Sequence, residues 1–120
     1  MQATKAQNQA VFNMAARHLL DQMEQSATSE GVCLYRGANG LACAVGCLIE
    51  PSYYSEKLEG EDLYSSEVRA ALRCSLGFDP ELEILMDLRQ IHDETEPDSW
   101  RGELYCLASA LKLSTESLEK

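Results

Sequence analysis

The stretch Cys33-Leu-Tyr-Arg-Gly-Ala-Asn-Gly-Leu-Ala-Cys-Ala-Val-Gly-Cys-Leu-Ile49 is the part of the chain that we expect to decide the fold. It holds three of the five cysteines, and every residue from Leu41 to Ile49 is apolar or glycine. A segment that is apolar on all sides is buried on all sides. We therefore expect the rest of the chain to pack around residues 41–49.

The same stretch contains signals for a turn and for a helix end. Asn39-Gly40 is a strong turn dipeptide because both residues tolerate a positive φ, so the sequence predicts a small two-stranded β-hairpin over residues 32–42. From Cys43 the chain can enter a short helix. Pro51 forbids its continuation, so this buried helix is expected over residues 43–50.

Outside this stretch, apolar residues recur at helical spacing. Expected caps are Thr4 for the first helix, Ser65 or Ser66 for the third, Asp79 before Pro80 for the fourth and Asp98 for the last. The predicted helices outside the motif cover residues 4–26, 65–76, 80–94 and 99–113. The predicted fold class is thus mainly α, with about five helices packed around the short 43–50 helix and one small hairpin. Residues 1–120 are expected to form a single domain, with 114–120 as a frayed tail.

Composition narrows the class of protein and the cellular compartment that the chain is expected to have. A chain of 120 residues with 45% hydrophobic residues can bury a core of its own. No run of about 18 apolar residues and no signal-peptide pattern is present, so we expect a cytoplasmic protein without membrane contact. In a reducing compartment, free buried cysteines behave as small hydrophobes, which is the role expected for most of the five.

The charge is unevenly distributed along the chain. Residues 50–98 hold 14 acidic and four basic residues, which accounts for the whole formal net charge of −10. This imbalance argues against direct nucleic-acid binding, which needs a basic surface, and favours a partner with a basic surface. Simple solubility is the alternative explanation. The candidate binding residues are Glu56, Glu59, Glu61, Asp62, Glu83, Asp87 and Glu94.

Two kinds of chemistry compete with a structural role for the cysteines. Cys43 at the start of a helix would have a lowered thiol pKa, and His92 could activate it as a nucleophile. Asp93 is expected to orient His92 poorly, because neighbours on a helix point about 100° apart. The second possibility is a zinc site of Cys33, Cys43, Cys47 and His92, although its spacing lacks the short Cys-x2–4-Cys element of structural zinc sites. The interpretation that we favour has no catalytic residue, no metal and no cofactor.

Arg36 and Tyr35 are candidates for a ligand pocket. The guanidinium of Arg36 either ties the hairpin to a carboxylate or to helix carbonyls, or recognises an anionic ligand. Both roles are left open by the sequence.

The pattern of the central stretch, followed by Glu59-Gly60, His92-Asp93 and Trp100, resembles that of a family of small proteins found in phage, prophage and bacterial genomes. The resemblance covers roughly residues 10–113. The resemblance assigns no catalytic role to any residue of this chain. What it implies is an accessory protein of a mobile element or of its host, a setting in which compact acidic proteins often bind and block a host machine.

Together these observations favour a small, acidic, non-enzymatic interaction protein of phage or mobile-element origin. It would bind and inhibit a host protein through residues 50–98, with mimicry of nucleic acid as one form of this. The alternative is a small enzyme or ligand-binding protein with a pocket around Arg36, Cys43 and His92.

Overall fold

The computed structural model describes residues 3–28 and 30–119, and its first element is helix α1 (Lys5–Gln22). Thr4 caps this helix as predicted. Its side chain accepts the backbone N–H of Gln7, and the Gln7 side chain accepts the backbone N–H of Thr4 in return. The helix ends at Gln22, four residues earlier than the prediction, because its C-cap Met23 takes a left-handed conformation with φ 51°.

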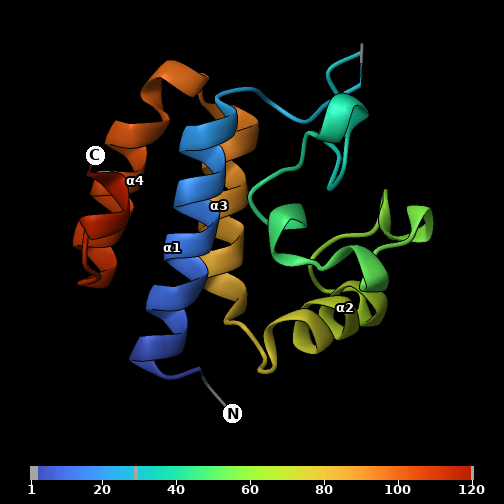
Figure 1. The fold of residues 1–120 in the computed structure, drawn as a ribbon, viewed down its shortest axis with the longest axis horizontal. Coiled ribbons are helices and arrows are strands. Elements are labelled where there is room, and N and C mark those ends of the chain that lie inside the picture. The colour runs from blue at the N-terminus through green and yellow to red at the C-terminus, as the bar shows by residue number, and fades with distance from the viewer. Residues whose placement is uncertain (1–2, 29, 120) are drawn as a thin grey trace.

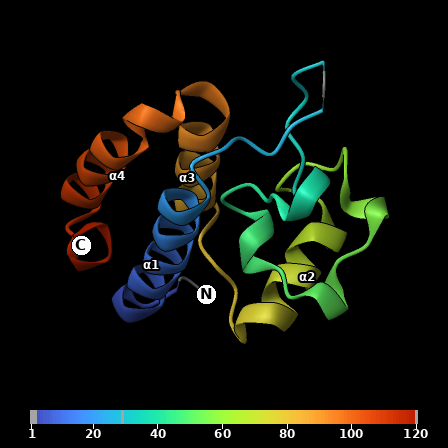
Figure 2. The same cartoon turned by 45° about the horizontal axis from the view of Figure 1, so that its top comes forward.

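Three further helices follow: α2 (Ser66–Leu76), α3 (Leu82–Glu94) and α4 (Pro97–Leu111). Helices α1, α3 and α4 contact one another and form one half of the molecule. The other half consists of α2 and the irregular segment between α1 and α2 (Figures 1 and 2). The mainly helical class is confirmed, with four α-helices in the described part of the chain instead of about five.

The starts of the last two helices differ from the prediction by about two residues. Ser65 and Gly77 bound α2 as expected. Helix α3 begins after Glu81, however, because the Asp79 carboxylate turns away to pair with Arg73 at 2.9 Å instead of capping. Helix α4 begins at Pro97, so Asp98 lies inside its first turn, where an acid is also favourable.

The predicted helix over residues 43–50 is not formed. The segment contains only a 3-10 turn at Gly46–Leu48, which contacts both α1 and α2. Gly46 passes so close to the Tyr35 carbonyl that an added Cβ would lie 1.9 Å from its oxygen. The Ile49 carbonyl accepts a hydrogen bond from the Arg36 guanidinium. The prediction that residues 41–49 are buried is confirmed for all but Leu41 and Cys47, which are half-buried.

The predicted hairpin over residues 32–42 is not supported either. In its place the described residues show two isolated β-bridges, Ala27 with Cys33 and Arg36 with Ala42. The Glu59 carboxylate takes the N–H groups of both Tyr35 and Arg36, each at 2.9 Å, and the Tyr35 N–H is the group that would otherwise extend the ladder beyond the Arg36–Ala42 bridge. The turn itself forms as expected, with positive φ at Asn39 and Gly40.

The C-terminal end contributes to the core, contrary to the frayed tail that the sequence predicted for residues 114–120. Residues Glu116–Leu118 form a 3-10 turn against α1, and Leu118 is fully buried; residue 120 lies outside the described part. The radius of gyration is 13.4 Å, close to the value of about 13.6 Å expected for a compact domain of this length. No helix among the described residues is long and apolar enough to cross a membrane.

Candidate functional site

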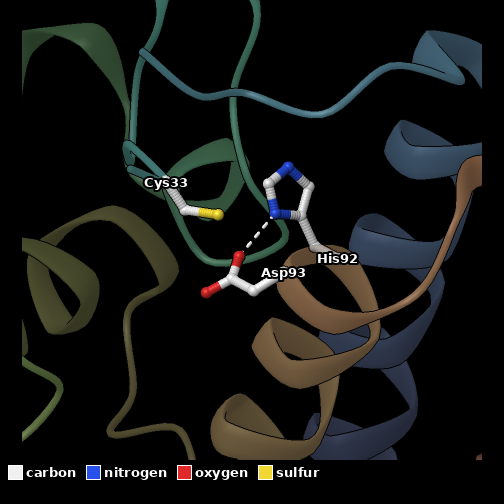
Figure 3. Close-up of side chains that lie close together, drawn as sticks. All are labelled: Cys33, His92 and Asp93. Atoms are coloured by element: carbon white, nitrogen blue, oxygen red, sulfur yellow. Dashed lines mark hydrogen bonds and ion pairs between the residues drawn. The ribbon is translucent and has the colours of Figure 1, made fainter. Parts of the chain in front are cut away.

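The end of α3 carries the most concentrated chemistry in the molecule. His92 and Asp93 lie in its last turn, and Cys33 approaches them from the loop after α1 (Figure 3). One atom from each side chain lies within 4.8 Å of the other two. Cys33 and Asp93 also line a hollow of about 320 Å³, whereas His92 is fully buried.

The hydrogen bonds of His92 define its tautomer. The backbone N–H of Ser26 donates to Nε2 at 2.9 Å, so Nε2 carries no proton. The proton of the neutral imidazole is therefore on Nδ1, which donates to the Asp93 carboxylate at 2.6 Å. The ring also stacks on Trp100, with 5.5 Å between the ring centroids. His92 thus joins the segment after α1 to α3 and α4.

The prediction that Asp93 orients His92 poorly was wrong. Their backbone directions do diverge, but Nδ1 and the carboxylate oxygen are each only two bonds from Cβ, so short side chains on adjacent residues can still meet. Burial by itself would raise the pKa of Asp93. The hydrogen bonds from His92 and Cys33 and the charge of Arg89 outweigh it and keep the pKa below its ordinary value.

The cysteines of this region are protonated thiols. Burial raises the pKa of Cys33 to about 11, and the hydrogen bond to Asp93 adds to this effect. Burial likewise raises the pKa of Cys43 and of Cys47 to about 12. Cys43 was expected at a helix start with a lowered pKa, but the helix is absent and the side chain is buried. Both nitrogens of His92 are engaged, by the Ser26 N–H and by the Asp93 carboxylate, so the imidazole has no free nitrogen that could activate the Cys33 thiol.

The four predicted zinc ligands do not come together. Only Cys33 and His92 belong to the cluster with Asp93, and the Cys47 thiol donates to the Ala44 carbonyl at 3.2 Å. A metal on Nδ1 of His92 would require the ring proton to move to Nε2. That proton would then face the N–H of Ser26. The hydrogen bonds of this site therefore oppose metal binding at His92.

Arg36 and Tyr35 act within the fold. The Arg36 guanidinium donates to the Ile49 carbonyl and lies 5.4 Å from the centre of the Tyr54 ring. Tyr35 donates its hydroxyl to the Glu61 carbonyl at 2.7 Å, and burial raises the pKa of Tyr35 to about 12. Tyr35 and Cys43 line the hollow beside Cys33, but Arg36 does not, so Arg36, Cys43 and His92 share no pocket there.

Two other hollows lie along α3, and neighbouring hollows share lining residues. The second, of about 430 Å³, shares Asp62, Arg89 and Asp93 with the first. The third, of about 420 Å³, shares Asp87, Gln90 and Glu94 with the second. We call the three together the acidic groove. Its carboxylates are Glu59, Glu61, Asp62, Asp87, Asp93, Glu94 and Glu103.

Among the residues that the structure describes, positive charge along the acidic groove is confined to Arg89, which pairs with Asp93 at 3.5 Å. Tyr64 and Met86 line the middle hollow with 68% and 45% of their surface exposed. The groove therefore combines unpaired carboxylates with exposed apolar surface.

Five of the seven predicted binding acids line this groove, and two do not. Glu56 lies outside it, and Glu83 lines a separate hollow with Lys5 and Glu81. Glu59 is in the groove, but its oxygens are occupied by Tyr35, Arg36 and the Tyr54 hydroxyl, so its role is structural. The groove also contains Glu103, which lies beyond the predicted acidic region of residues 50–98, and Asp93, which the sequence suggested only as a partner of His92.

Comparisons of the chain with family models, with curated proteins and with solved structures gave no match. The family resemblance of residues 33–49 and the setting that it implies therefore stay predictions.

Proposed function

We propose that this chain is a non-enzymatic interaction protein whose acidic groove binds a basic surface of another protein. The observation that carries the proposal is that seven carboxylates from three separate segments line three adjoining hollows. Glu59 is engaged within the fold, and Asp93 pairs with Arg89, the one cation that lines these hollows among the described residues. The other five carboxylates form no ion pair in the described part of the chain. A surface of this kind attracts a positively charged partner and repels nucleic acid. The phage or mobile-element origin implied by the resemblance makes a host protein the natural partner.

The chemistry at the end of α3 supports binding rather than catalysis. The thiols are protonated, and both nitrogens of His92 are engaged within the fold. A partner that normally holds nucleic acid fits the groove well, since its basic surface matches a row of carboxylates. By occupying that surface the chain would inhibit the partner.

The test is affinity purification from host lysate with three forms of the chain. These are the wild type, a groove variant Asp62→Asn/Asp87→Asn/Glu94→Gln, and a control variant Glu24→Gln/Glu30→Gln/Glu119→Gln. The two variants lose the same charge, and the control residues are exposed and lie outside the groove. We expect a basic protein to be retained by the wild type and the control at low salt and released at high salt, because screening weakens exposed charge pairs.

Binding is then measured with the purified partner. The proposal holds if the groove variant weakens binding by about tenfold or more, with a smaller salt dependence, and the control does not. Equal binding of all three forms, or retention that is independent of salt, would show that the acidic groove is not the binding surface.

A further inference from the structure

Helices α3 and α4 form an antiparallel pair that α1 covers on one side. Helix α1 packs against both of them (Figure 1). The third hollow of the acidic groove is lined by α3, by α4 and by Thr95 between them, with no residue from α1. It therefore lies on a side of the pair that α1 leaves open.

This hollow has an apolar base and acidic edges. Ile91 and Leu107 are its apolar residues, and both belong to or pack against the hydrophobic core. Asp87, Gln90 and Glu94 follow one edge at spacings of three and four, so they stand in a row along α3. Glu103 of α4 lies across from them.

We propose that the occupant of this hollow is a basic amphipathic helix of the partner protein, packed between α3 and α4 opposite the acidic row. This inference rests on the proposed function and specifies the partner's recognition element. A helix fits because two packed helices present a groove that matches the ridge of a third, and α3 with its 13 residues offers about 20 Å of length. Basic side chains fit because the charged residues that line this hollow in the described part of the chain, Asp87, Glu94 and Glu103, are all acidic. An apolar stripe fits over Ile91 and Leu107.

Two synthetic peptides test this directly. One has lysines on one face of a helix and leucines at i, i+3, i+4 and i+7, and the other is a scrambled sequence of the same composition without an apolar face. Both are labelled, and binding to the intact chain is followed by fluorescence anisotropy. We expect the amphipathic peptide to bind about tenfold more tightly than the scrambled one. Asp87→Asn/Glu94→Gln/Glu103→Gln should remove this preference, and Glu24→Gln/Glu30→Gln/Glu119→Gln should keep it.

Two exposed cysteines provide a matched probe of position. Cys106 lines the hollow, whereas Cys74 lies on α2 outside it. The amphipathic peptide should slow alkylation of Cys106 by iodoacetamide at least about fivefold and leave Cys74 unchanged. Equal protection of both thiols, or of neither, would overturn the proposed position.

The outcomes separate this inference from the proposed function. If both peptides bind alike and Asp87→Asn/Glu94→Gln/Glu103→Gln weakens the binding of both, the surface binds basic chains without selecting a helix. The helix inference then falls and the proposed function stands. If neither peptide binds, the helix inference also falls, and the purified-partner measurement decides the proposed function.

Discussion

At the scale of single residues, His92 connects the segment after α1 to helices α3 and α4. It accepts from Ser26, donates to Asp93 and stacks on Trp100 while fully buried. Such a side chain leaves unsatisfied polar groups and an empty volume when it is removed.

We therefore expect His92→Ala to lower the free energy of unfolding by about 3 kcal/mol. His18→Ala is the control, since His18 is half-buried and makes one hydrogen bond, at 2.8 Å to the Ala42 carbonyl. Its cost should be about 1 kcal/mol. Urea unfolding followed by Trp100 fluorescence measures both. Equal losses would contradict the role assigned to His92.

The five cysteines should divide into two groups by reactivity. Cys74 and Cys106 are exposed, whereas the pKa of Cys33 is raised to about 11 and those of Cys43 and Cys47 to about 12. Since the thiolate is the reacting form, Cys33 should be alkylated roughly 100-fold more slowly at pH 8 than an ordinary thiol.

Peptide mapping after timed iodoacetamide treatment gives the rate at each cysteine. Fast labelling at Cys74 and Cys106 alone is the expected result, and denaturant should equalise all five rates. If Cys43 in the folded protein reacted faster than a free thiol, the nucleophile interpretation would regain support.

At the scale of elements, Gly46 shows why the central stretch is a 3-10 turn and not a helix. Its backbone packs directly on the Tyr35 carbonyl, leaving no room for a side chain. Gly46 is needed because two backbone segments approach closely here, and the helix propensity of the stretch does not reveal this.

Gly46→Ala should therefore lower the free energy of unfolding by at least about 2 kcal/mol, because the backbone must move to admit the methyl group. Gly102 lies within α4 and has open space where its Cβ would be, so Gly102→Ala should stabilise the protein by about 0.5–1 kcal/mol. Chemical denaturation of both variants checks the pair. A neutral effect at Gly46 would mean that the contact with Tyr35 is easily relaxed.

At the scale of the whole molecule, the acidic groove gathers like charges with one cation among them. Carboxylates held close together repel, so a binding surface of this kind reduces the stability of the unbound protein.

Asp87→Asn/Glu94→Gln/Glu103→Gln should therefore raise the midpoint of thermal unfolding by a few degrees at low salt, and the gain should shrink at high salt. Glu24→Gln/Glu30→Gln/Glu119→Gln removes the same charge from outside the groove and should change the midpoint less. Thermal scans at two salt concentrations compare them. A gain that is the same for both variants would indicate a general effect of net charge.

The sequence by itself determined the features that depend only on residues close together in the chain. Thr4, Ser65 and Gly77 bound helices because a cap acts on backbone groups within one turn, and the apolar run ending at Ile49 is buried because no side of it can face water. The uneven charge was also visible along the chain.

Only the tertiary structure decided what these elements bring together. Glu59 takes the amides of Tyr35 and Arg36, and Cys33 meets Asp93, across gaps in the sequence that no local pattern bridges. For the same reason the acidic groove could not be predicted as a whole. Its lining comes from residues 32–35, 43, 59–64, 86–95 and 103–107, and it depends on how α3, α4 and the segment between α1 and α2 pack together. Periodicity and capping act over one or two turns, whereas a site made by distant segments exists only once the core has fixed their positions.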